Sequence, residues 1–86
     1  MEAGGLWESL DLHGLKREAA LHELDLWLNR AVLLDVREGR VICGWGQGVL
    51  LKLVATELGR HPLVETYRAE GPAFIVEIVP RSDGDP

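Results

Sequence analysis

The chain has 86 residues, of which 47% are hydrophobic, which is enough for one packed core but not for two. Its formal net charge of −5, from 9 basic and 14 acidic side chains, disfavours tight nonspecific binding to long DNA, although a local basic site is still possible. No apolar run approaches the roughly 20 residues of a membrane span, and the first residues lack the pattern of a secretory signal. With the lone Cys43, these features predict a soluble protein of the reducing cytoplasm that has no membrane contact.

The first predicted element is a short strand that ends at a glycine turn, Leu10-Asp11-Leu12-His13-Gly14-Leu15. Side chains alternate between the two faces of a strand, so Asp11 and His13 share one face, opposite Leu10 and Leu12. Two titratable groups held this close can divide acid and base roles. The alternative is structural, with Asp11 capping the turn and His13 bonded to the backbone.

Apolar residues at helical spacing predict a long helix from Leu15 to about Val36, with Glu38-Gly39 as its stop signal. Further apolar residues widen its stripe, and we expect most of them to be covered in a domain of this size. They are Leu26, Trp27, Val32 and Leu33.

A second strand, Arg40 to Cys43, is followed by the glycine-rich loop Gly44-Trp45-Gly46-Gln47-Gly48 and by a helix from Val49 to Gly59. Such a loop can cradle a phosphate with backbone N–H groups. Its spacing matches neither the P-loop nor the dinucleotide fingerprint, so we exclude nucleotide hydrolysis and NAD binding. We expect Cys43 to be a buried strand residue and Trp45 to be exposed for base stacking.

The strand-like segments Val64 to Ala69 and Phe74 to Val79, joined by Glu70-Gly71-Pro72, predict a hairpin. The order β-α-β-α-β-β predicts an α/β two-layer sandwich, a four-stranded mixed sheet with both helices on one face, because strand-helix-strand crossovers are right-handed. We assign residues 9–79 to this domain, residues 1–8 to an N-terminal extension that leads into strand one, and residues 80–86 to a disordered acidic tail. We also expect Trp7 and Trp27 to be structural, His22 to lie on a helix surface and His61 at a helix end.

Together these motifs resemble the Smr (small MutS-related) domain family. Leu10 to Gly14 resembles its L-D-L-H-G motif, Cys43-Gly44-Trp45-Gly46 stands in the place of its H-G-x-G motif, and His61-Pro62-Leu63-Val64 resembles its H-P-x-V segment. The resemblance covers roughly Ser9 to Val79. It implies a sandwich similar to the C-terminal domain of a bacterial translation initiation factor. It also implies an endonuclease that nicks DNA or cuts RNA, in DNA recombination and repair or in ribosome-associated mRNA quality control.

The resemblance also implies roles for individual residues. Asp11 and His13 would be the catalytic pair, and the loop from Gly44 to Gly48 would contact the substrate phosphate. We expect no metal and no cofactor, because no third ligand of the right type lies near the pair. The expected partners are nucleic acid, the ribosome and a larger MutS2-type protein. The full expected nucleic-acid-binding set is Gly14, Lys16, Arg17, Cys43, Gly44, Trp45, Gly46, Gln47, Gly48 and Lys52.

The chain departs from the family pattern at the second motif, where Cys43 replaces a histidine and Trp45 replaces a lysine or another polar residue. A cysteine cannot act as a cation near neutral pH as imidazole can. We therefore expect weak, metal-independent endonuclease activity. The alternatives are a catalytically degenerate module that binds nucleic acid or the ribosome, and a protein-interaction module, which the acidic charge favours.

Overall fold

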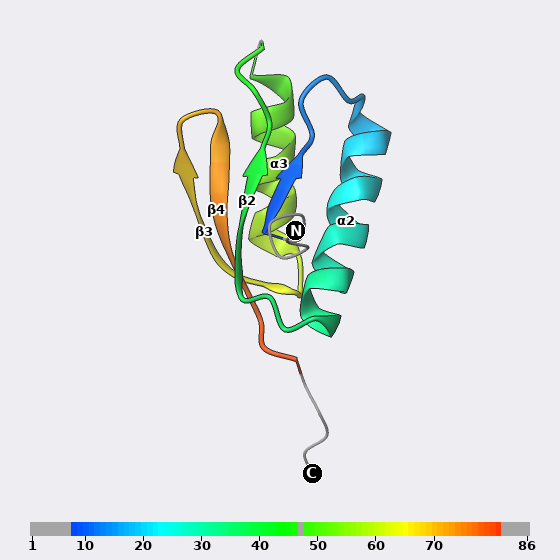
Figure 1. Cartoon of the computed structure of the whole chain (residues 1–86). Helices are drawn as coiled ribbons and strands as arrows, with labels where there is room; N and C mark the ends of the chain where they lie inside the picture. Colours follow the sequence, from blue (N-terminus) through cyan, green and yellow to red (C-terminus); the bar gives the residue numbers. More distant parts are fainter. Residues whose placement is uncertain (1–7, 47, 82–86) are drawn as a thin grey trace, which may run out of the picture.

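The predicted order of elements is confirmed in the computed structural model, which describes residues 8–46 and 48–81 (Figure 1). The strands form one sheet in the order β1-β2-β4-β3; β1 runs parallel to β2, and the other neighbours are antiparallel. The mixed four-stranded sheet is therefore as expected. The elements are β1 (Ser9–Asp11), α2 (Arg17–Leu33), β2 (Glu38–Ile42), α3 (Val49–Arg60), β3 (Val64–Glu70) and β4 (Ala73–Ile78).

Parts of the sequence-based expectations lie outside these described residues. They include Trp7, Gln47, most of the N-terminal extension and the predicted tail beyond residue 81. Within the ranges that the structure describes, no helix has the length and apolar character needed to cross a membrane.

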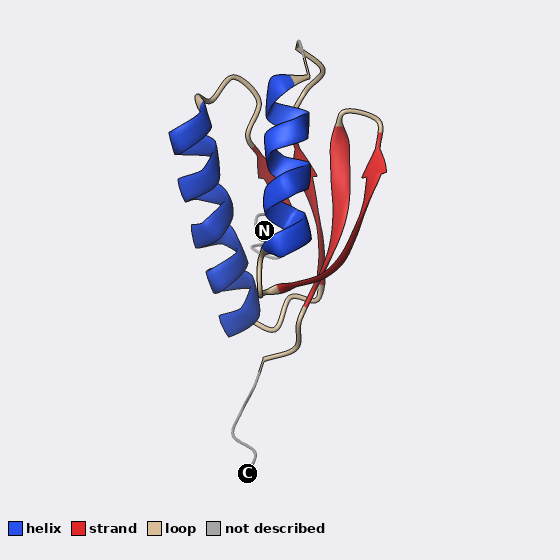
Figure 2. Ribbon diagram, turned by 180° about the vertical axis from the view of Figure 1, so that it is seen from behind, coloured by secondary structure: helices blue, strands red, loops and turns tan. Residues whose placement is uncertain are grey.

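Both helices cover one face of the sheet, as the crossover rule requires (Figure 2). The core lies between the two layers, and Trp27 is buried there as expected. The sheet and both helices contribute fully buried side chains to this core. They are Val41 and Val76 from the sheet, Leu24 and Leu28 from α2, and Val54 and Leu58 from α3.

Among the described residues, no helix lies on the other face of the sheet, and this face is charged. Glu38 and Arg40 are exposed there, because they alternate along β2 with the buried Gly39 and Val41. Arg40 forms an ion pair with Glu70 at 2.7 Å. A hollow of about 320 Å³ lies on this face, lined by Glu8, Glu38, Gly39, Arg40, Arg68, Glu70 and Ile75. It touches neither Asp11 nor His13.

The end of α2 corrects the sequence prediction. The helix ends at Leu33 instead of Val36, and Glu38-Gly39 belongs to β2. Asp35 adopts a left-handed conformation with φ of 59°, its N–H donates to Val32 O, and the Val36 N–H donates to Ala31 O. This is the Schellman arrangement, which usually has glycine at the left-handed position. Because the chain has aspartate and not glycine at this position, the sequence contains no signal for the end of the helix.

The apolar stripe of α2 is also less covered than predicted. Val32 is half-buried, but Leu26 and Leu33 are exposed, the latter by 65%. These two residues are seven positions apart and so lie on the same stripe of the helix. Only one side of α2 packs against the rest of the domain, so the side of the helix that carries Leu26 and Leu33 is exposed.

Gly39 is required where α2 packs against β2, and this leads to a stability prediction. A Cβ at Gly39 would lie 2.5 Å from Cη2 and 2.6 Å from Cζ2 of the Trp27 ring, well inside normal carbon–carbon contact distances. We expect Gly39→Ala to destabilise the fold by about 1–3 kcal/mol through overpacking, measured by urea denaturation. The control is Gly59→Ala, where the new Cβ would meet only the tip of the Tyr67 side chain at 3.2 Å and alanine favours the helix. Equal stability of Gly39→Ala and wild type would contradict the prediction.

Candidate functional site

The two motifs meet at one edge of the sheet. The C-terminal ends of β1 and β2, the N-terminal ends of α2 and α3, and the β3–β4 turn all lie at the upper end in Figure 1. The parallel pairing places Asp11 opposite Ile42, and the Leu12 N–H donates to Ile42 O at 2.7 Å. Ligands of open α/β sheets gather at the carboxyl ends of parallel strands. As expected, the Asp/His turn and the glycine loop therefore border the same region.

Gly44 brings the loop against His13. It adopts φ of +81°, and a Cβ placed on it would lie 3.3 Å from the His13 Cβ. Glycine therefore meets two needs here: it permits the left-handed backbone and leaves room for the histidine.

Asp11 and His13 form a direct pair. Oδ1 of Asp11 accepts the His13 backbone N–H at 3.1 Å and lies 2.8 Å from His13 Nδ1. These hydrogen bonds, the side-chain one first, lower the pKa of Asp11 from its ordinary 3.8. The carboxylate is thus ionised at neutral pH and can only accept, so His13 Nδ1 carries the proton that it donates.

The remaining ring nitrogen of His13 is therefore the reactive position. With the proton on Nδ1, neutral His13 has its lone pair on Nε2, and the side chain is 70% exposed. The structural alternative for Asp11 is also realised, since the carboxylate caps the turn through the backbone N–H of residue 13. The cap and the side-chain bond together fix the imidazole in one orientation.

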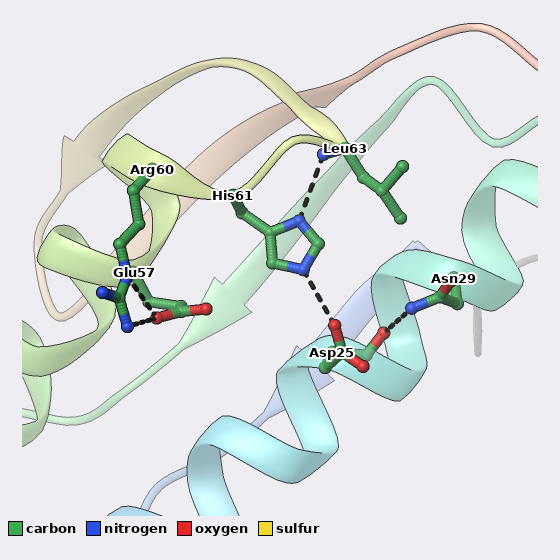
Figure 3. A network of polar contacts seen from close by, with 6 residues as sticks. All are labelled: Asp25, Asn29, Glu57, Arg60, His61 and Leu63. Atoms are coloured by element: carbon green, nitrogen blue, oxygen red, sulfur yellow. Dashed lines mark hydrogen bonds and ion pairs between the residues drawn. The ribbon is translucent and has the colours of Figure 1, made fainter.

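A second histidine–aspartate pair serves as an internal comparison (Figure 3). His61 follows the last residue of α3; its Nδ1 accepts the Leu63 N–H at 3.1 Å, and its Nε2 donates to Asp25 Oδ1 at 2.9 Å. Both ring nitrogens are occupied and the side chain is only 6% exposed, so this pair ties α3 to α2. The sequence predicted the helix-end position of His61, but it held no signal for a partner 36 residues away.

The Asp/His turn and the glycine loop meet at one corner of the domain, which we call the Asp/His corner. Exposed aromatic and basic side chains surround this corner. Trp45 is 65% exposed, as predicted, and lines a hollow of about 270 Å³ together with Gly14, Cys43, Gly44, Gly46 and Gly48. Lys16 is the N-cap residue of α2, Arg17 begins that helix, and Lys52 lies in the first turn of α3. The structure thus places every described member of the predicted nucleic-acid-binding set at this edge.

The family model of the Smr domain matches residues 10–74 of the chain. This chain belongs to the Smr domain family. Among its relatives, Endonuclease MutS2 of Staphylococcus epidermidis is 41% identical over 64 residues, which are 74% of this chain and 8% of that protein. Endonuclease MutS2 of Clostridium beijerinckii is 39% identical over 59 residues, or 69% of this chain and 8% of that protein. The chain therefore spans only a small part of the length of these relatives.

The fold agrees with a solved member of the family. The crystal structure of the Smr domain of Thermus thermophilus MutS2 superposes with a TM-score of 0.82 at 28% identity, covering 85% of this chain and 99% of that one. The shared architecture is therefore the Smr fold.

Cys43 marks the departure of this Smr domain from the family's second motif. The residue is buried, as predicted, but it directly follows β2 and is not part of the strand. Burial raises the pKa of its thiol to about 11, so the side chain is neutral at physiological pH. It supplies neither a cation nor a thiolate there.

Several backbone N–H groups in the loop of this Smr domain already donate hydrogen bonds within the protein, so fewer of them are available to bind a phosphate. The N–H groups of Cys43 and Gly44 donate to Pro72 O at 2.8 and 3.0 Å, and the Gly48 N–H donates to Trp45 O at 2.9 Å. These three donors hold the loop against the β3–β4 turn and close it on itself. A phosphate contact from this loop would therefore have to use its other groups.

Metal ligands are the last feature to consider. In the part of this Smr domain that the structure describes, no three side chains among His, Cys, Asp and Glu lie close enough together to hold a metal ion. Asp11 and His13 engage each other instead.

Proposed function

We propose that this Smr domain is a weak endonuclease that cleaves RNA, with His13 as the proton-transferring group and Asp11 as its positioning residue. The observation that carries the proposal is the 2.8 Å contact between Asp11 Oδ1 and His13 Nδ1. It leaves Nε2 of an exposed imidazole available beside the glycine loop. The relatives named Endonuclease MutS2 support an endonuclease.

The proposed reaction needs one well-placed base. His13 Nε2 removes the proton of a ribose 2′-hydroxyl, and the 2′-oxygen attacks the adjacent phosphorus. The bond from phosphorus to the 5′-oxygen breaks, and that oxygen takes up a proton from the imidazolium or from water. The products are a 2′,3′-cyclic phosphate and a 5′-hydroxyl. Such general acid–base catalysis contributes about 10²–10⁴-fold in rate.

Asp11 is not the acid of this reaction. Its carboxylate accepts two hydrogen bonds from His13, which lower its pKa, so it holds no proton to donate near neutral pH. Its role is to fix the tautomer and the orientation of the imidazole. In the sequence-based expectation, by contrast, the two residues divide the acid and base roles between them.

RNA is favoured over DNA because it carries its own nucleophile. DNA lacks the 2′-hydroxyl, and its hydrolysis would need an activated water in addition to the histidine. We propose a cytoplasmic role in ribosome-associated mRNA quality control, with the ribosome as partner and a larger MutS2-type protein as one context. DNA nicking in recombination or repair is the competing outcome of the test.

A cleavage assay separates these outcomes. Labelled single-stranded RNA, the same RNA with one 2′-deoxy nucleotide at the mapped cleavage position, and supercoiled DNA are incubated with the purified protein. We expect RNA fragments with cyclic phosphate ends, and no cut at the 2′-deoxy position. Nicked DNA beside intact RNA would overturn the RNA assignment, and intact RNA and DNA would overturn the enzyme.

A binding module without catalysis is the second candidate. The neutral, buried Cys43 thiol favours it, because the position offers no charge to a phosphate. This candidate predicts nucleic-acid or ribosome binding without cleavage in the same assay.

A further inference from the structure

Most basic side chains of this protein already have a partner. The sequence contains nine lysines and arginines, all within the described ranges 8–46 and 48–81. Those with an interaction partner within the protein are Arg30, Arg37, Arg40, Arg60 and Arg81. Within the same ranges, Lys16, Arg17, Lys52 and Arg68 have no such partner. Lys16, Arg17 and Lys52 lie beside the Asp/His corner, whereas Arg68 lies on the face of the sheet opposite the helices.

Two of these cations share one hollow. Arg17 from α2 and Lys52 from α3 line a space of about 290 Å³ between the helices. No carboxylate is among the lining residues, so the two positive charges meet no opposite charge within this hollow. Its other lining residues are Val49, Leu53 and Thr56.

The lining suits a nucleotide better than a bare anion. Val49 and Leu53 offer apolar surface that a base or ribose can cover, while Arg17 and Lys52 supply charge for a phosphate. The Thr56 hydroxyl can donate or accept one further hydrogen bond. Basic side chains along a groove are typical of sites that track the backbone of single-stranded nucleic acid.

This hollow continues from the corner. Val49 lines both the hollow between the helices and the one formed by Gly14, Gly44 and Trp45. A strand whose scissile phosphate lies beside His13 can therefore extend into the space between Arg17 and Lys52 without crossing the sheet.

We infer that the hollow between α2 and α3 is a second phosphate subsite, which binds a nucleotide of the substrate strand next to the one being cleaved. It sets a minimum length for substrates, because a strand too short to reach it loses the contact with Arg17 and Lys52. The inference rests on the proposed function, since it takes the strand to be the substrate of His13.

Binding by a His13→Ala background separates this subsite from the chemistry. Fluorescein-labelled oligouridylates of two to eight nucleotides are titrated at several salt concentrations, and anisotropy is followed. We expect Arg17→Gln and Lys52→Gln each to weaken binding of the longer strands by about tenfold. Each should also reduce the salt slope by about 0.7, the value for one contact to a single strand. Dinucleotides should bind the variants and their parent equally.

Arg68→Gln is the matched control, because it removes another unpartnered cation from the opposite side of the sheet. It should leave affinity and salt slope unchanged. An equal loss with Arg68→Gln would show a diffuse charge effect and overturn the subsite, as would full affinity of Arg17→Gln and Lys52→Gln. RNA cleavage by wild type with no effect of these variants would refute the subsite alone. Binding that depends on Arg17 and Lys52 without any cleavage would refute the proposed enzyme and support the subsite.

Discussion

Replacing His13 with alanine is expected to lower RNA cleavage by about 10²–10⁴-fold, the usual contribution of a positioned general base. The fold should be unaffected, because the side chain is 70% exposed and bonds to its neighbour Asp11. Initial cleavage rates and thermal melts of the same preparations check both parts. His22→Ala is the control, since it removes another exposed histidine from α2 outside the corner. Full cleavage by His13→Ala would show that another site or a contaminant cuts the RNA.

Asp11 should act through the histidine and not on the substrate. Asp11→Asn keeps an acceptor for the imidazole but loses the charge, so we expect a smaller loss of rate than for His13→Ala. The lowered pKa of Asp11 also determines how folding stability depends on pH. The stabilisation from the ionised Asp11 carboxylate is present above the ordinary pKa of 3.8 and is lost as the pH falls through the lower pKa of the folded protein. Activity changes between about pH 5 and 8 therefore report a group other than Asp11.

The sequence predicted the parts of this molecule that depend on local pattern. Alternation in Leu10 to His13 placed Asp11 and His13 on one face, and glycine-rich stretches marked the turns. Parallel pairing of the first two strands then followed from the order of elements, so the meeting of His13 with Gly44 was predictable.

Contacts between distant residues were not predictable in the same way. The bond from the Gly44 N–H to Pro72 O joins two turns whose relative position depends on the whole sheet. The His61–Asp25 pair likewise depends on how α3 packs against α2. The end of α2 was missed for a local reason, because Asp35 takes a conformation that glycine normally marks. Long-range packing thus decided which loop groups are still available to a ligand.

Replacing Cys43 with histidine is expected to raise the cleavage rate. The family's second motif has histidine at this position, whereas the buried Cys43 thiol, with its pKa raised to about 11, offers no charge to a phosphate. Cys43 lines the hollow that also contains Gly44 and Trp45, so an imidazole at this position would border the same hollow. One donor in a preorganised site is worth about 10²–10³-fold in rate. The gain can approach this range if the imidazole reaches the phosphate.

The substitution also carries a packing cost, which decides how it must be measured. Enlarging a buried side chain destabilises by about 1–3 kcal/mol, so rates are compared well below the melting temperatures of both proteins. Cys43→Leu is the size control, because it enlarges the side chain without adding a hydrogen-bond donor or a charge, and it should give no comparable gain. If the wild type cleaves RNA and Cys43→His lowers its rate with the fold intact, then cysteine is the adapted residue. In that case the cysteine would not be the cause of weak cleavage, and the loop would hold its substrate in a different way.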